Sequence, residues 1–344
     1  MLQIKWRMRM ISGAILVLLG SLLAAGHPSS AQTLVVGNKS ADTVSFIDLK
    51  TGIIKATRAS GHGPHEVAIS PDGAMAAVVA YGSAARPGHT VSLYDVPTAT
   101  ALKVIDLTPH SRPHGLAFSA DGSRLLITTE GSGALIVVNI ESGKVVQSIE
   151  TGQQVSHMLA VSEDGTRAYV ANIGSGSYCV IDLVAGTVVR TVLSGPESEG
   201  IALGPDENEL WVSSRTDNSV SIFDTQTHEV LATIKTGRMP IRVAVHPDGR
   251  HAITTNARDG TISLIDYATR AVIKTIALQS AKGGETVPVT AIFSPDGQRL
   301  YVAMTNASEI AVIDAKSWQQ IGRLPAGEGS DGLGWSPLSL KVDA

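Results

Sequence analysis

The sequence contains only one cysteine, Cys179, among its 344 residues. A single thiol cannot form an intramolecular disulfide, which excludes a small disulfide-stapled scaffold. Charge is also sparse, because charged residues make up 17% of the chain and the formal net charge is −4. A weakly acidic chain lacks the basic surface that nucleic acids and anionic lipids attract, so we expect no nucleic-acid partner. Stability must come from a large hydrophobic core, which a 43% hydrophobic composition supports.

Long apolar runs are missing beyond the N-terminus, since charged or turn residues interrupt every one of them. The exception is residues 11–26, which follow three basic residues and precede small residues at Ser29 and Ala31. This order is typical of a secretory signal peptide. We therefore predict a signal peptide over residues 1–31 and a periplasmic or secreted domain over residues 32–344, without membrane insertion after cleavage. An uncleaved leader that anchors the chain is the alternative.

A short phrase recurs seven times along the chain, at spacings of 42 to 49 residues. The copies are GPHEVAISPDG, RPHGLAFSADG, VSHMLAVSEDG, ESEGIALGPDE, MPIRVAVHPDG, VPVTAIFSPDG and a degenerate GSDGLGWSPLS. Short apolar or alternating runs follow, separated by turn sequences such as PDG, TN and TG, as in a four-stranded antiparallel unit. Periods of about 40 to 50 residues indicate the blades of a β-propeller.

The chain begins out of phase with this repeat. Residues 33–58 contain three predicted strands without a first strand, whereas the seventh phrase, at Gly329, is a first strand without followers. Joining the two completes one blade from both ends of the chain, which removes the open sheet edges. We therefore predict an all-β fold, a seven-bladed β-propeller closed by N-terminal strands that complete the last blade, in a single domain.

The strands RAYVAN, RLYVAMTN and HAITTN resemble the signature of the YVTN-repeat family of propellers over nearly the whole mature chain. This resemblance implies the fold but no single function, because such propellers occur in binding proteins, surface proteins and enzyme domains. The phrases GPHEVAIS and RPHGLAFS are also similar to those of seven-bladed lactonases of the phosphogluconolactonase type, which implies a hydrolytic pocket. The propellers of nitrous oxide reductase and the haem d1 nitrite reductases are similar in architecture only.

Alignment of the seven phrases places one residue of each at an equivalent position, near the start of the innermost strand. These residues are His65, His114, His157, Glu199, Ile241, Val289 and Asp331. Because consecutive blades are neighbours in a closed ring, their side chains should surround one mouth of the central channel. Imidazoles and carboxylates that converge there suit Zn²⁺, Cu²⁺ or Fe²⁺. We predict a divalent transition-metal site whose ligands are the three histidines and Glu199, with Asp331 as a further ligand contact.

Three more residues are candidate ligand contacts. Glu66 and Arg242 each follow the ring position by one residue, and suit either a charged ligand group or a salt bridge between blades. His89 lies in the longest loop between a second and a third strand, which favours either a lid over the mouth or an ordinary mobile loop. Cys179 aligns with small residues, which predicts a packed and unreactive thiol.

Three classes of function fit these observations. The first is a monomeric binding or accessory protein that holds a metal, a small ligand or a protein partner at the histidine-bearing mouth. The second is a lactonase-like hydrolase or another metal-dependent enzyme. The third is a structural or cell-surface interaction protein, in which the ring histidines only hydrogen-bond neighbouring backbone. If a metal binds, its affinity should fall as the pH drops through about 6.5, the ordinary histidine pKa. We expect the remaining histidines His228, His246 and His251 to lie solvated at the opposite face.

Overall fold

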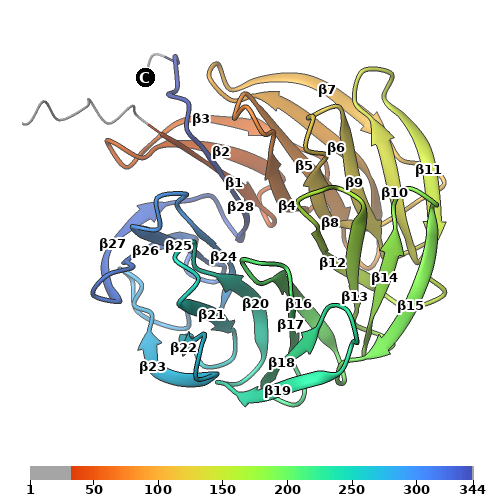
Figure 1. The fold of residues 1–344 in the computed structure, drawn as a ribbon. Coiled ribbons are helices and arrows are strands. Elements are labelled where there is room, and N and C mark those ends of the chain that lie inside the picture. Colours follow the sequence, from red (N-terminus) through yellow and green to blue (C-terminus); the bar gives the residue numbers. More distant parts are fainter. Residues whose placement is uncertain (1–31, 343–344) are drawn as a thin grey trace, which may run out of the picture.

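The computed structural model describes residues 32–342, and the signal peptide predicted over residues 1–31 lies outside this part. In the described chain, 28 strands form seven four-stranded antiparallel sheets that surround a central channel like the blades of a propeller (Figure 1). No helix in residues 32–342 has the length and apolar character that crossing a membrane requires. The all-β, seven-bladed propeller predicted from the repeats is confirmed.

Blades 1 to 3 are continuous in sequence, and the first strand of each is innermost. Blade 1 contains β4 (Pro64–Ile69), β5 (Met75–Gly82), β6 (Pro87–Asp95) and β7 (Thr100–Asp106). Blade 2 contains β8 (Pro113–Phe118), β9 (Arg124–Thr129), β10 (Ala134–Asn139) and β11 (Lys144–Glu150). Blade 3 contains β12 (Ser156–Val161), β13 (Arg167–Asn172), β14 (Ser177–Asp182) and β15 (Thr187–Leu193).

Blades 4 to 6 repeat this arrangement. Blade 4 contains β16 (Ser198–Leu203), β17 (Glu209–Ser214), β18 (Ser219–Asp224) and β19 (Val230–Lys235). Blade 5 contains β20 (Pro240–Val245), β21 (His251–Asn256), β22 (Thr261–Asp266) and β23 (Ala271–Ala277). Blade 6 contains β24 (Pro288–Phe293), β25 (Arg299–Met304), β26 (Glu309–Asp314) and β27 (Gln319–Pro325).

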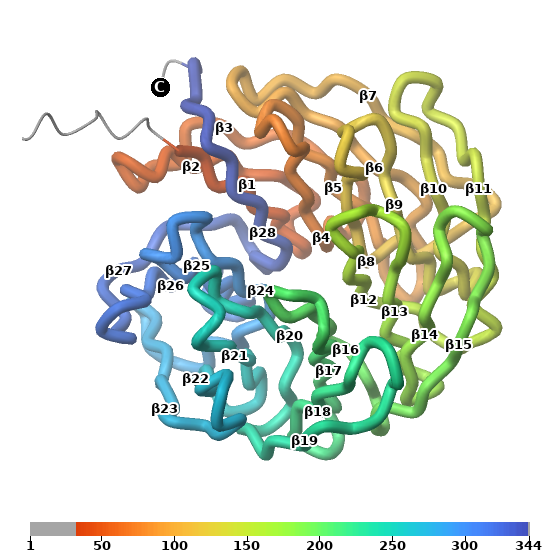
Figure 2. Tube along the Cα trace, viewed as in Figure 1, coloured from red at the N-terminus to blue at the C-terminus, as the bar shows by residue number. Residues whose placement is uncertain are grey.

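Blade 7 is built from both ends of the described chain. Its strands follow the order β28 (Ser330–Ser336), β1 (Thr33–Asn38), β2 (Thr43–Asp48) and β3 (Ile53–Ala59). β1 and β28 are antiparallel, with Thr33 opposite Ser336 and Val36 opposite Leu333. Figure 2 shows the two ends of the colour scale side by side in this blade. The predicted closure of the ring by N-terminal strands is therefore confirmed.

The hydrophobic core lies between the blades, because each sheet packs both of its faces against neighbouring sheets. One cluster, for example, joins Val79 and Val91 of blade 1 to Leu125 and Ile136 of blade 2. This explains the sequence pattern: the second and third strands are buried on both faces and read as continuous apolar runs, whereas outer strands such as β11 alternate between exposed and covered residues.

The asparagine of the family signature has a structural function in this chain. The side-chain amide of Asn38 donates to the Ser45 hydroxyl on the adjacent strand (2.9 Å), and its carbonyl oxygen accepts from the Gly327 amide (2.9 Å). In blade 3, Cys179 replaces the equivalent serine and lies 3.4 Å from the amide nitrogen of Asn172. Cys179 is fully buried, and that burial raises the pKa of its thiol, so the prediction of a packed cysteine is confirmed.

One prediction about the opposite face is wrong. His246 is buried rather than solvated, with 7% of its surface exposed. Its Nε2 donates to the Gly297 carbonyl (2.8 Å), its Nδ1 accepts from the Asp248 amide (3.0 Å), and its ring packs edge-on against Phe293. Nε2 therefore joins blade 5 to blade 6, and Nδ1 holds the turn between β20 and β21 within blade 5.

Candidate metal site at the channel mouth

The seven equivalent positions of the innermost strands surround one cavity of about 420 Å³. Hydroxyl groups on the second strands hold neighbouring inner strands in register. In blade 2, the Thr128 hydroxyl accepts from the Gly115 amide (2.8 Å) and donates to the His157 carbonyl of blade 3. In blade 5, Thr255 links the Arg242 amide to the Val289 carbonyl of blade 6 in the same way. These bridges fix the backbone from which the ring side chains project.

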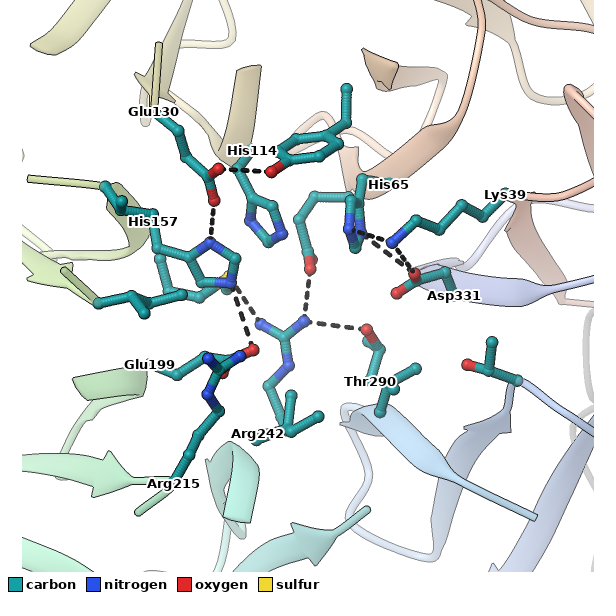
Figure 3. A pocket seen from close by; sticks show the side chains of 18 residues that line it. Lys39, His65, His114, Glu130, His157, Glu199, Arg215, Arg242, Thr290 and Asp331 are labelled. Carbon is teal, nitrogen blue, oxygen red and sulfur yellow. Dashed lines mark hydrogen bonds and ion pairs between the residues drawn. The ribbon is translucent and has the colours of Figure 1, made fainter. Parts of the chain in front are cut away.

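The three ring histidines lie in contact, as the alignment of the repeats predicts. The ring centroid of His114 is 4.3 Å from that of His65 and 3.5 Å from that of His157. Tyr81 packs edge-on against His65 and His114. Figure 3 shows the three imidazoles side by side, with Glu130 and Glu199 next to His157 and Asp331 next to His65.

His114 is the central member of this group and is 2% exposed. Neither of its ring nitrogens has a hydrogen-bond partner among the described residues. Burial, together with the charges of His157 and His65, holds the pKa of His114 well below its ordinary value, so its imidazole is neutral at neutral pH. An unpaired buried polar group costs about 1–3 kcal/mol, so two such nitrogens on one side chain call for a bound partner.

His157 has the opposite character, because two carboxylates flank it. Its Nδ1 lies 2.5 Å from a Glu130 oxygen and its Nε2 lies 3.4 Å from a Glu199 oxygen. Burial disfavours the charged ring, but these hydrogen bonds and charges outweigh burial and raise the pKa of His157 to about 9. The same contact lowers the pKa of Glu130, against the effect of its own burial. His157 therefore carries a proton at neutral pH.

Of the predicted metal ligands, the structure places the three histidines in two groups that share His114, each with a glutamate that was not predicted as a metal ligand. One consists of His65, Glu66 and His114, and the other of His114, Glu130 and His157; in each, one candidate ligand atom per residue lies within 4.8 Å of the others. Glu199 and Asp331 belong to neither group. Each instead contacts one ring histidine and one cation: Glu199 contacts Arg215 (2.8 Å) and Asp331 contacts Lys39 (3.6 Å). Glu199 and Asp331 are therefore in position to orient His157 and His65, as carboxylates next to metal-ligating histidines commonly do.

Several cavity residues were missed by alignment of the first strands alone. They occupy a second set of equivalent positions, next to the signature asparagine at the end of the second strand. This second ring consists of Lys39, Tyr81, Glu130, Ile173, Arg215, Ala257 and Thr305. All of them except Ala257 line the cavity. The same repeat alignment, extended to the second strand, contains the signal that would have identified them.

Glu66 and Arg242, predicted as ligand contacts or as an interblade salt bridge, pair with each other across the channel. An Arg242 guanidinium nitrogen lies 2.5 Å from a Glu66 oxygen, and about one tenth of each side chain is exposed. The same nitrogen donates to the Thr290 hydroxyl (2.9 Å). His89 is not among the residues that line the cavity. Its side chain is 52% exposed and contacts Asp106 (3.0 Å) at the outer part of blade 1.

Replacing Arg242 with methionine should lower the free energy of unfolding by about 3 kcal/mol, because Glu66 would be left buried without a partner. Methionine has a similar length, so the loss reflects charge rather than a cavity. The double variant Glu66→Gln, Arg242→Met should recover most of this loss. Urea denaturation of chelator-treated protein measures both values. Equal stability of the parent and the single variant would show that the pair is not a buried ion pair.

Comparisons with known proteins agree with this architecture. A family model described as "Lactonase, 7-bladed beta-propeller" matches residues 32–272. A functionally unknown protein from Desulfotomaculum acetoxidans is similar in structure, with a TM-score of 0.74 at 15% identity over 88% of this chain and 98% of that one. The dihydro-heme d1 dehydrogenase NirN, solved in complex with DHE, gives a TM-score of 0.65 at 18% identity over 88% of this chain and 74% of that one. No curated protein matches the sequence.

The two structural similarities concern the fold alone, because both identities are below 25%. The family match rests on the sequence itself and spans blades 1 to 4, the first three strands of blade 5 and the N-terminal strands of blade 7. The chain therefore belongs to the lactonase family of seven-bladed β-propellers.

Proposed function

We propose that the protein binds one divalent transition-metal ion at the channel mouth, through His114, His157 and Glu130. The observation that carries this proposal is the state of His114, a buried and neutral imidazole with both nitrogens unpaired among residues 32–342. A ligand imidazole must be neutral, and its coordination to a metal would satisfy a nitrogen that the fold leaves without a partner. His65 is the next imidazole on the other side of His114.

The distribution of charge favours the group that contains Glu130 over the group that contains Glu66. Of the four carboxylates that line the cavity, three have a Lys or Arg partner within 4 Å: Glu66, Glu199 and Asp331. In the described chain Glu130 contacts no such cation, and only His157 and the Tyr81 hydroxyl are bonded to it. A buried carboxylate without a permanent countercharge is the natural place for a metal ion.

Two imidazoles and one carboxylate leave coordination positions open. Such sets occur with Zn²⁺ in hydrolytic sites and with Fe²⁺ in oxygen-dependent ones, and imidazole also suits Cu²⁺. The open positions would face the cavity of about 420 Å³, so the ion can hold a second molecule there. Glu199, on the far side of the His157 ring, would keep that ring oriented.

Two functions are compatible with this site. A binding or accessory function requires only that the ion and its ligand be held. Lactone hydrolysis is the second candidate, and the family match is the observation that favours it. A metal ion with an open position lowers the pKa of bound water, which supplies the nucleophile for such a reaction. If zinc-loaded protein hydrolyses γ- and δ-lactones and chelator-treated protein does not, the result would favour an enzymatic function over a binding function.

We propose that either function is performed outside the cytoplasm, as the leader pattern of residues 1–31 indicates. The mass of the protein recovered from a periplasmic fraction tests this proposal. A mature N-terminus at Gln32 is the expected result. A full-length protein retained in the membrane fraction would support the anchored alternative instead.

Calorimetric titration of chelator-treated protein with Zn²⁺ and with Cu²⁺ tests the metal site. We expect one ion per chain, with an affinity that rises with pH up to about 9, because the His157 proton competes with the metal. Below that pH the affinity should fall about tenfold per pH unit, rather than only below the ordinary histidine pKa of about 6.5. Absence of detectable binding at pH 9 would refute the site and favour an interaction surface without a metal.

A further inference from the structure

We propose that the ligand held beside the metal is a small organic monoanion with an apolar body, and that Arg215 recognises its charged group. This inference rests on the proposed metal site and names the class of molecule which that site would hold. It follows from the charge of the cavity, from the unused hydrogen-bonding capacity of its arginines and from the apolar residues in its lining.

A bound metal ion makes the charge of the cavity positive. Besides the histidines, seven residues of the lining carry a charge, namely Lys39, Glu66, Glu130, Glu199, Arg215, Arg242 and Asp331. These three cations and four carboxylates add up to −1 before the histidines and the ion are counted. A divalent ion with neutral imidazole ligands brings the total to +1. One monoanion would restore neutrality in this enclosed space, whereas a neutral ligand or a dianion would leave a net charge there.

Arg215 is the cation best placed to meet such an anion. It follows β17 in blade 4, its side chain is 21% exposed, and it lies 3.0 Å from Glu197 and 2.8 Å from Glu199. Its buried Nε has no hydrogen-bond partner among the described residues. Figure 3 shows Arg215 beside Glu199 and His157, with Lys39 on the other side of the histidines. The guanidinium therefore borders the proposed metal ligands and still has a donor to offer.

Lys39 is the second cation at the mouth. Its Nζ lies 2.8 Å from His65 Nε2 and 3.6 Å from Asp331, and 38% of its side chain is exposed. The Nε of Arg242 is also unpaired among the described residues, but one of its terminal nitrogens is bonded to both Glu66 and Thr290, and its side chain is less exposed than that of Arg215. Lys39 and Arg215 thus flank the histidines from blade 7 and blade 4, and an anion bound at the metal would lie between them.

Five apolar residues also line the cavity. They are Val155, Met158 and Ile173 of blade 3, Ile241 of blade 5 and Val289 of blade 6. At about 30 Å³ per water molecule, the volume of about 420 Å³ equals that of roughly 14 waters. A short branched or cyclic carboxylate fits this space, with its hydrocarbon portion against the apolar residues and its carboxylate toward Arg215 and the metal.

Isovalerate is a suitable probe, because it combines one negative charge with a branched apolar body. Titrated into zinc-loaded protein, it should bind at least about tenfold more tightly than its neutral isostere isovaleramide, the difference that one charge-assisted hydrogen bond of about 1.4 kcal/mol or more provides. Acetate, which lacks the apolar body, should also bind more weakly. Chelator-treated protein, which lacks the charge and the open coordination positions of the ion, should bind none of the three.

Arg215→Gln should remove the preference for isovalerate over isovaleramide while one zinc still binds per chain. The matched control is Arg190→Gln, an exposed arginine on the outer strand β15. If the first variant does not fold, Lys39→Met tests the same recognition from the other side. If the parent protein binds one zinc per chain but binds isovalerate and isovaleramide equally well, this inference is wrong and the metal site is unaffected. Failure of zinc to bind would overturn both.

Discussion

Replacing His114 with alanine is expected to weaken binding of Zn²⁺ and Cu²⁺ by at least about 100-fold, since loss of even an outer-shell partner of a metal ligand commonly costs 10–100-fold. His114 belongs to both candidate ligand groups, so its loss cannot be compensated by the ion moving from one group to the other. Isothermal titration calorimetry of chelator-treated parent and variant measures the difference. Stability should change little, because the substitution removes a buried side chain that has no hydrogen-bond partner in the described chain.

The matched control for this experiment is His89→Ala. His89 is also a histidine beside a carboxylate, but its side chain is 52% exposed and lies outside the cavity. His246 is unsuitable, because both of its nitrogens are used and its loss would disturb the packing between two blades. Equal metal affinities of the His114→Ala and His89→Ala variants would disprove the site.

The fold was predictable because every blade packs in the same way and therefore has the same strand pattern. Each blade buries both faces of its middle strands, so the apolar runs and the turns that separate them recur with each repeat. Equivalent positions in consecutive blades must then be neighbours in space. For that reason the contact between His65, His114 and His157 was visible in the alignment.

The partners of these histidines were not visible in the same way. Glu130 and Arg215 come from the end of second strands, and recognising them requires knowing that this end faces the same mouth as the start of the first strand. The pair between Glu66 and Arg242 joins blades that are not neighbours, so no repeat spacing indicates it. Which side chains pair across a channel depends on its width and on their reach.

The error on His246 has a more local origin. It occupies the position held by the serine of the SPDG phrase in other blades, and the equivalents Ser70 and Ser294 are buried. The equivalents Ser119 and Ser162 are only partly buried, so the position pairs with its turn in each case without being buried in each. His246 is buried because its ring reaches Gly297 and Phe293 of blade 6, a contact that the repeat pattern does not show.

The second large effect is expected from removal of the strands that close the ring. A chain that begins at Gly61 lacks β1, β2 and β3 and should not unfold in a cooperative transition. Six apolar side chains in β1 and β2 are fully buried, namely Leu34, Val35, Val36, Val44, Phe46 and Ile47. At about 1.5–3 kcal/mol for each, their loss amounts to roughly 9–18 kcal/mol. That loss is of the same size as the total stability of about 5–15 kcal/mol that is usual for a domain.

A circular permutant separates loss of these strands from loss of an N-terminal segment as such. In the permutant, residues 61–342 are followed by a flexible Gly/Ser linker and then by residues 32–60. β28 and β1 are antiparallel, with Thr33 opposite Ser336. The linker must therefore lead from the segment after β28, which reaches Pro97 at Lys341, back to the start of β1, and all four strands of blade 7 are retained. Thermal unfolding followed by circular dichroism should show a cooperative transition for the permutant, close to that of residues 32–344, and none for the chain that begins at Gly61. Identical melting of the truncated chain and the chain of residues 32–344 would mean that the ring does not depend on this closure. If residues 32–344 unfold cooperatively and the permutant does not, the last blade needs the natural chain order as well as its four paired strands.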